Sequence, residues 1–255
     1  MGIILPVLFL IGLVFGSFLN CLVYRLNHGL SPLGGRSFCP KCKHKLSWKD
    51  NLPLVSFVLL RGRCRYCRSP ISWQYPLVEL GTAIVTLLTV SFLLRAGQPN
   101  LVVVGFWLLV TYGLLVVFVS DFLYSTIPDE VVFSLVGLAC LYFLFFQPFL
   151  VVPNLFSGLG AAGFFWALMA VTGGKGMGMG DVKLAGLMGL ILGWPGIVIA
   201  LYLAFLTGAL VGVILILTGR KRFGQHLPFG PFLATATWIT IFWGDKISSW
   251  VQTWL

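Results

Sequence analysis

The sequence predicts an all-α polytopic membrane protein of about eight transmembrane helices with one small polar loop domain. Of the 255 residues, 58% are hydrophobic and 9% are charged, and this composition excludes an ordinary soluble domain. Apolar runs long enough to cross the hydrocarbon core of a bilayer recur along most of the chain. A single polar and basic segment, residues 24–75, interrupts them and contains two Cys-x-x-Cys pairs.

The apolar runs predict the helices in order. The first run lacks the basic start and the small-residue cleavage site of a secretory signal, so we interpret it as a membrane anchor. The sixth run is short, and residues 182–218 alternatively form one span plus a re-entrant segment. The eight predicted spans are residues 3–23, 76–94, 101–120, 131–150, 154–172, 182–194, 196–218 and 229–247.

The basic residues predict how the helices are oriented. With eight spans, three groups of basic residues fall on one side of the membrane, and only Arg95 and Lys246 fall on the other. The positive-inside rule makes the basic side cytoplasmic and places both termini outside. The net charge of +10 therefore reflects topology, and no nucleic-acid partner is expected. The basic residues of the cytoplasmic side are Arg25, Arg36, Lys41, Lys43, Lys45, Lys49, Arg61, Arg63, Arg65, Arg68, Lys175, Lys183, Arg220, Lys221 and Arg222.

Four cysteines in the polar segment predict a metal site. Cys39 and Cys42 form one Cys-x-x-Cys pair, and Cys64 and Cys67 form the other. Each pair directs two thiolates at one tetrahedral ion, and the separation between the pairs is typical of structural zinc sites. The alternative is redox-active or disulfide pairs, which a reducing cytoplasmic loop disfavours. The remaining cysteines, Cys21 and Cys140, lie in apolar spans and are expected to be small buried hydrophobes.

The zinc site also predicts the domain organisation. Residues 24–75 are too few for a normal hydrophobic core, so a metal is expected to hold this segment together. We therefore divide the chain into a first transmembrane helix (1–23), a cytoplasmic four-cysteine module (24–75) and a transmembrane bundle (76–255).

Two aspartates are the candidate reactive residues. Asp121 closes the third span, and Asp181 follows a glycine-rich run at the start of the sixth. An ionisable group at the edge of hydrocarbon is costly and is a functional-site candidate by default. Asp181 alternatively caps its helix, whereas Asp121 is a poor helix C-terminal residue because of the helix dipole. Two carboxylates at one membrane face suggest shared-proton chemistry on a carbonyl.

The glycine run next to Asp181 has two interpretations. Gly178 and Gly180 allow another strand or a substrate peptide to approach the backbone, and we expect positive φ at Gly180. Alternatively, these glycines allow tight helix packing. The run matches no nucleotide-binding register.

Other polar residues have structural explanations. Asp129 is expected to cap the fourth span, and Asp50 and His226 are expected to be solvated loop residues. Arg25 is expected to extend to the headgroups, and Asn20 to form helix–helix hydrogen bonds. For Glu79, one turn into the second span, a functional role and pairing with a basic loop residue are both open.

Several segments resemble the bacterial type IV prepilin peptidases, which are membrane aspartyl proteases with a Gly-x-Gly-Asp motif. The resemblance covers nearly the whole chain. Its segments are GSFLNCLVYRL at 16–26, CPKC at 39–42, CRYC at 64–67, ISWQYPLVEL at 71–80, the stretch from Asp121 to Asp129, GMGD at 178–181 and LPFGPFLA at 227–234. The resemblance implies that Asp121 and Asp181 are the catalytic pair. Many relatives have a second aspartate two positions after the first, where this chain has Leu123.

The resemblance also implies an activity. The family removes the basic leader from prepilins and pseudopilins at the cytoplasmic side of the inner membrane. Many members then methylate the new N-terminus with S-adenosylmethionine. No cofactor motif is present in the sequence, so methylation is implied by resemblance alone. Alternatives are a peptidase without methyltransferase activity, a non-catalytic membrane assembly scaffold, and a proton-coupled carrier, which the gathering of acidic residues at one face disfavours.

Overall fold

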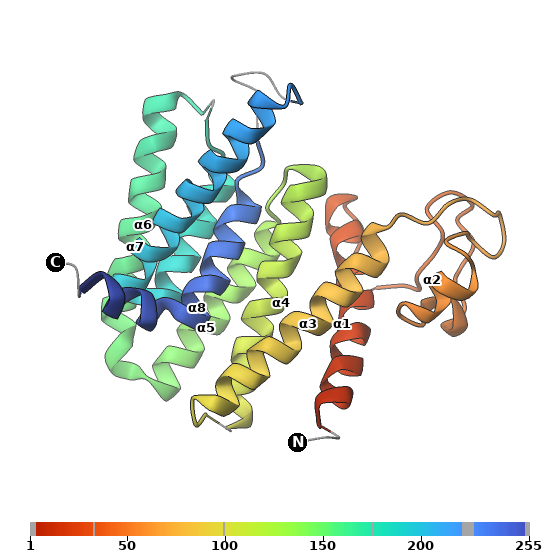
Figure 1. The fold of residues 1–255 in the computed structure, drawn as a ribbon, viewed down its shortest axis with the longest axis horizontal. Helices are drawn as coiled ribbons and strands as arrows, with labels where there is room; N and C mark the ends of the chain where they lie inside the picture. Colours follow the sequence, from red (N-terminus) through yellow and green to blue (C-terminus); the bar gives the residue numbers. More distant parts are fainter. Residues whose placement is uncertain (1–3, 33, 99, 175, 221–226, 253–255) are drawn as a thin grey trace. The chain divides into compact units, whose positions relative to one another are not determined.

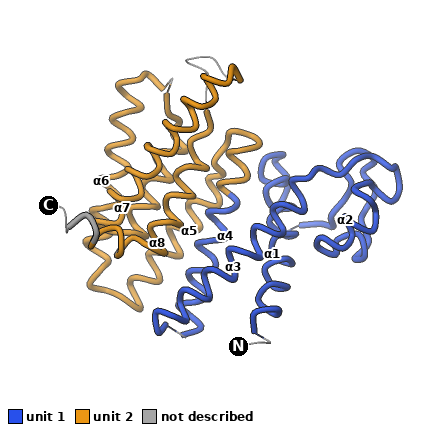
Figure 2. The backbone as a smooth tube through the Cα atoms, in the orientation of Figure 1, with its two compact units in different colours: residues 1–116 blue, residues 117–255 orange. Residues whose placement is uncertain are grey.

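A computed structural model describes residues 4–32, 34–98, 100–174, 176–220 and 227–252. The predictions for Lys175, Lys221, Arg222 and His226 lie outside these residues. The chain forms two compact units, Met1–Val116 and Val117–Leu255, which Figure 2 distinguishes by colour. The long helix α4, Leu101–Tyr124, contributes its first part to unit 1 and its last part to unit 2.

Unit 1 contains two long helices that pack closely, α1 (Ile4–Asn27) and α3 (Gln74–Arg95). Two glycines of α1 make this approach possible. An ideal Cβ on Gly12 would lie 2.5 Å from the Cα of Ala83, and one on Gly16 would lie 2.6 Å from the Cα of Glu79. Any larger residue at either position would therefore separate the two helices.

The loop between α1 and α3 contains a short 3₁₀ helix, Trp48–Asn51, and α2, Val55–Leu59 (Figure 1). Polar residues of the helices hold this loop in place. Arg25 is buried, and its guanidinium donates to the carbonyls of Gly34, Gly35 and Arg36. The expectation that Arg25 extends to the headgroups is therefore wrong, because the loop carbonyls provide its acceptors.

Glu79 and Asn20 join the same contact region. The Glu79 carboxylate accepts the backbone N–H of Leu54 at 2.8 Å, so its partner is loop backbone rather than a basic side chain. The Asn20 amide donates to the carbonyl of Tyr75 at 3.0 Å, which confirms the expected helix–helix hydrogen bond. Both interactions provide a partner for a polar group that would be costly in an apolar helix.

Unit 2 contains α5 (Asp129–Phe146), α6 (Pro148–Thr172), α7 (Met179–Leu217), α8 (Gly230–Gln252) and the end of α4. The helical pattern of α7 breaks at Gly193, which has φ 62°, and at Trp194. Close to this break, the side-chain amide of Asn154 on α6 donates to the carbonyl of Leu190 at 3.0 Å. The break coincides with the boundary predicted between the sixth and seventh spans.

Six described helices are long and apolar enough to cross a membrane, namely α1, α3, α4, α5, α6 and α7. Since α7 contains two of the predicted spans and α8 corresponds to the last, each predicted span lies mostly in a helix. The predicted fourth span, 131–150, is too long at its end, because α5 ends at Phe146 and α6 begins at Pro148. The fold is therefore an all-α polytopic membrane protein, as the composition predicted. The expected burial of Cys140 is wrong, because this residue is exposed on α5, and Cys21 is half-buried.

Candidate functional site

Asp121 lies in the last turn of α4 and is buried, with 5% of its surface exposed. Its carboxylate accepts the backbone N–H of Gly230 at 2.8 Å, and Gly230 is the first residue of α8. The N-terminus of a helix carries partial positive charge and favours an anion. The start of α8 therefore provides what the C-terminal end of α4 does not, a favourable electrostatic environment for the Asp121 carboxylate.

Asp181 lies in the first turn of α7, and 8% of its surface is exposed. Its carboxylate accepts the N–H of Gly178 at 3.0 Å, and Gly178 is the residue that precedes the helix. Asp181 is therefore not itself the N-cap residue; Gly178 is, and the carboxylate of Asp181, three residues later, accepts the N–H of that cap. Asp121 and Asp181 share one arrangement, because each is a buried carboxylate bonded to a backbone amide at the start of a helix.

Both aspartates lie at one end of unit 2. In Figure 1 the end of α4 and the starts of α5, α7 and α8 lie together at the top of this unit. Two contacts connect the segment after Asp121 to the start of α7. An ideal Cβ on Gly180 would lie 3.0 Å from the Cβ of Ile127, and Lys183 forms a salt bridge of 2.7 Å with Asp129. The fold therefore gathers the segments that carry both candidate residues.

The Asp129 salt bridge corrects one prediction. The side chain of Asp129 forms no cap at the start of α5, where Pro128 is the capping residue. Its carboxylate instead accepts both of its hydrogen bonds from Lys183, at 2.7 and 2.8 Å. The ammonium of Lys183 attracts the charge of Asp129 more strongly than a neutral amide would.

Gly180 does not have the expected positive φ. Gly178 has φ −93° and ψ 163°, which is extended backbone, and Gly180 lies in the first turn of α7. Neither has positive φ. The space next to Gly180 is occupied by Ile127, so a side chain at this position would push against the loop between α4 and α5.

Gly230 is a residue of the site that sequence reasoning missed. An ideal Cβ at this position would lie 2.8 Å from Oδ2 of Asp121, so the carboxylate can approach only because no side chain is present. The available signal was a glycine between Pro228 and Pro231 in the segment LPFGPFLA. That pattern indicates a turn and a helix start, but it does not identify the partner of the glycine.

The four cysteines of the loop form a second candidate site, in unit 1. The Sγ atoms of Cys39, Cys42, Cys64 and Cys67 all lie within 4.8 Å of one another. A tetrahedral zinc ion with Zn–S bonds of about 2.3 Å needs Sγ atoms about 3.8 Å apart. The distance between the Sγ atoms of Cys39 and Cys67 is 3.9 Å, so the donor set fits zinc.

The two cysteine pairs have the same backbone geometry. Lys43 donates its N–H to the carbonyl of Cys39 at 2.8 Å, and Arg68 donates to the carbonyl of Cys64 at 3.0 Å. Lys43 and Arg68 both have positive φ, of 59° and 60°. The loop therefore consists of two equivalent turns, each of which directs two thiols toward the same point.

Local hydrogen bonds favour the thiolate form in parts of this cluster. The side chain of Ser69 lowers the pKa of Cys67 to about 6. Burial raises the pKa of Cys39, but bonds from the amides of Cys42 and Lys41 outweigh it and lower the pKa overall. Because the thiolate is the form that ligates metal, both effects favour metal binding.

Asp50 contributes to the same module and is not the solvated residue that was expected. Its side chain is only 3% exposed and forms a salt bridge of 2.7 Å with Arg65. It also accepts hydrogen bonds from the N–H and the hydroxyl of Ser47, at 3.0 and 2.7 Å. Burial raises the pKa of Asp50, but the bonds from Arg65 and Ser47 outweigh it and hold this pKa below its usual value. Asp50 thereby connects the 3₁₀ helix to the second cysteine turn.

Comparisons with known proteins identify the family to which the chain is similar. The family model described as "Bacterial Peptidase A24 N-terminal domain" matches residues 10–93. The family model described as "Type IV leader peptidase family" matches residues 108–213. No solved structure matches the chain.

Three curated relatives are each named "Prepilin leader peptidase/N-methyltransferase". The protein from Aeromonas hydrophila is 35% identical over 96% of this chain and 92% of its own length. The protein from Pseudomonas aeruginosa is 35% identical over 94% and 90%, and the one from Bacillus subtilis is 33% identical over 96% and 96%. Because the similarity extends over almost the full length of each relative, the chain belongs to the type IV leader peptidase family.

Proposed function

We propose that this chain is a membrane aspartic endopeptidase that removes the basic leader from type IV prepilins or type II secretion pseudopilins, and that Asp121 and Asp181 are its catalytic residues. The observation that carries the proposal is the shared arrangement of the two aspartates. Both are buried carboxylates at one end of unit 2, and each accepts a backbone N–H at the start of a helix. The names of the relatives support the substrate class.

In the proposed mechanism one carboxylate takes a proton from water while the protonated partner polarises the scissile carbonyl. The roles then exchange as the leaving amine is protonated. The pair titrates as a unit, so neither role belongs to one residue alone. The backbone amides of Gly230 and Gly178 would stabilise the ionised member of the pair and fix its orientation.

We place the cleavage site at the cytoplasmic face of the inner membrane. The support is the distribution of charge, because the basic loops predict the cytoplasmic side and the two aspartates precede or follow spans on that side. The four-cysteine module lies on this side in the same topology. Cys39, Cys42, Cys64 and Cys67 would hold zinc in a structural role, because four protein ligands leave no open coordination position.

We further propose that the new N-terminus is methylated, as the names of the relatives indicate for those proteins. S-adenosylmethionine would supply the methyl group for this step. A peptidase without this second activity is the alternative.

Incubation of the purified protein with a prepilin, followed by mass analysis of the product, tests these proposals. Asp121→Asn and Asp181→Asn are each expected to abolish cleavage while the protein still folds, because Asn retains an oxygen that accepts the amide hydrogen bond. Asp129→Asn is the matched control and should change turnover little, because its exposed pair with Lys183 contributes roughly 1 kcal/mol or less.

The outcomes separate the alternatives. Near-normal turnover by either site variant would exclude that residue from catalysis. Absence of cleavage by the unaltered protein, with the substrate bound, would support the assembly scaffold. A cleaved but unmethylated terminus in the presence of S-adenosylmethionine would support the peptidase without methyltransferase activity.

A further inference from the structure

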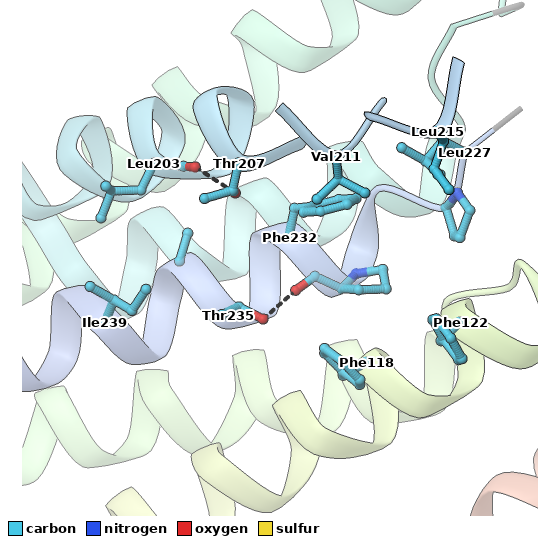
Figure 3. A pocket seen from close by; sticks show the side chains of 13 residues that line it. Phe118, Phe122, Leu203, Thr207, Val211, Leu215, Leu227, Phe232, Thr235 and Ile239 are labelled. Atoms are coloured by element: carbon cyan, nitrogen blue, oxygen red, sulfur yellow. Dashed lines mark hydrogen bonds between the residues drawn. The ribbon is translucent and has the colours of Figure 1, made fainter. Parts of the chain in front are cut away.

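An apolar groove of about 500 Å³ begins beside Asp121 in unit 2. Its walls are the last turns of α4, the second half of α7 and the first half of α8 (Figure 3). Phe118 and Phe122 line it from α4, and Asp121 precedes Phe122 in the chain. Pro228 and Pro231 line it from the other side, around the Gly230 that bonds the Asp121 carboxylate.

The groove offers almost no polar group to a ligand. Thr207 and Thr235 are the hydroxyl-bearing residues of its lining. Each hydroxyl donates within its own helix, from Thr207 to the carbonyl of Leu203 and from Thr235 to the carbonyl of Pro231, both at 2.7 Å. Figure 3 shows both bonds. A ligand therefore meets methyl groups and aliphatic or aromatic side chains along the whole groove.

The dimensions fit one face of an apolar segment. The lining runs along α7 from Leu203 to Leu215, which at about 1.5 Å per residue is a length of about 18 Å. A volume of about 500 Å³ accommodates several large side chains but not a complete helix. This is the geometry of an amphipathic or apolar helix whose anchoring side chains occupy a groove.

We propose that this groove binds the apolar segment of the substrate that is adjacent to the scissile bond, over a length of about 12 residues. The proposal rests on the function proposed above. A lipid tail would also fit an apolar surface, but two residues of the lining, Phe122 and Pro231, directly follow Asp121 and its hydrogen-bond partner Gly230 in the chain. A peptide whose carbonyl lies at Asp121 must leave along an adjacent path, and the groove is an apolar path that starts there.

Two valines of α7 provide a matched pair of variants. Val211 lines the groove, whereas Val213 is 54% exposed and is not part of the lining. Val211→Trp should fill the groove, and Val213→Trp adds the same side chain to the outer face of the same helix. Each variant is assayed on a full prepilin and on a short synthetic peptide that ends a few residues after the cleavage point.

Val211→Trp is expected to lower kcat/KM for the full prepilin at least tenfold, mainly by raising KM. The same variant should change kcat/KM for the short peptide by less than twofold. Val213→Trp should change kcat/KM for neither substrate by more than twofold. An unchanged kcat/KM of Val211→Trp for the full prepilin would overturn the proposal. An equal loss on both substrates would also overturn it, because that result indicates a disturbed Asp121 rather than a blocked groove.

Photo-crosslinking provides a second measurement that does not depend on turnover. A benzoylphenylalanine placed at Val211 should crosslink to the apolar segment of a bound prepilin, and one placed at Val213 should not. Crosslinks from position 211 to lipid alone would show that the groove is a lipid site and would overturn the proposal. If the unaltered protein cleaved neither substrate, the proposed function would fail, and the crosslinks would still decide the occupant of the groove.

Discussion

At the residue scale, the strongest constraint on the site is the contact between Asp121 and Gly230. These residues are 109 positions apart in the chain, and their hydrogen bond joins the end of α4 to the start of α8. The backbone amide of Gly230 holds the Asp121 carboxylate in one orientation before a substrate binds. This contact therefore preorganises one half of the proposed catalytic pair.

Gly230→Ala is therefore expected to reduce cleavage at least tenfold. The new Cβ would lie 3.0 Å or less from three atoms of Asp121, so the carboxylate must move. Gly163→Ala on α6 is the matched control, since its Cβ would meet no atom within 4 Å. Removing a helical glycine there should be neutral or should stabilise the protein by about 1 kcal/mol. Equal activity of the two variants would contradict the assigned role of Gly230.

Gly180→Val tests the role of the glycine run. The substituted side chain would contact Ile127, so both thermal stability and cleavage should fall if Gly180 serves only packing. The hypothesis that the loop also supports the substrate backbone predicts a larger effect on cleavage than on stability. Measurement of the melting temperature and of prepilin cleavage on one preparation distinguishes the two. Loss of activity in step with stability would eliminate the substrate role.

At the scale of elements, the contact between α6 and α7 depends on small residues. A Cβ on Gly189 would lie 2.6 Å from the Cα of Gly158 and 2.5 Å from the carbonyl oxygen of Ser157. The two helices therefore touch through their backbones, as helices do in membranes where apolar burial provides no driving force between them. This packing also supports the start of α7, which carries Asp181.

Gly189→Ala should consequently lower the thermal stability of the detergent-solubilised protein, by roughly 1–3 kcal/mol of unfolding free energy, because it overpacks this contact. Gly212→Ala on the same helix is the control, since a Cβ there meets nothing within 4 Å. A Gly189→Ala protein that melts at the same temperature as the control would show that α6 and α7 separate without cost.

The four-cysteine module should contain about one zinc ion per chain, because its four thiols form one closed tetrahedral set. Cys39→Ser or Cys64→Ser should lower the yield or the stability of the module more than it changes the intrinsic rate of cleavage, because the metal organises the loop. Metal analysis of the purified protein and thiol counting provide the measurement. A protein without zinc and with the cysteines in disulfides would refute this assignment.

At the scale of the whole molecule, the two compact units separate two tasks. Unit 1 contains the four cysteines, and unit 2 contains both aspartates and the groove. The two matched family models divide the chain in a similar way. The first match ends at residue 93 and the second begins at residue 108, near the boundary between the units after Val116. The division into residues 1–23, 24–75 and 76–255 stays a prediction about which parts fold as units.

The sequence by itself determined the membrane class, the approximate helical segments and the clustering of the four cysteines, and it singled out two candidate aspartates, because each of these depends on a local signal. Apolar length, Cys-x-x-Cys spacing and a charge at the edge of hydrocarbon are all legible within a few residues. The partners of the polar groups were decided only by tertiary structure. Asp129 pairs with Lys183, 54 positions away, although its place after a proline indicated a cap. Likewise, Arg25, Asp50 and Asp121 have partners in other segments. Each local position permits several partners of similar energy, and the packing of the helices determines which one comes within hydrogen-bonding distance.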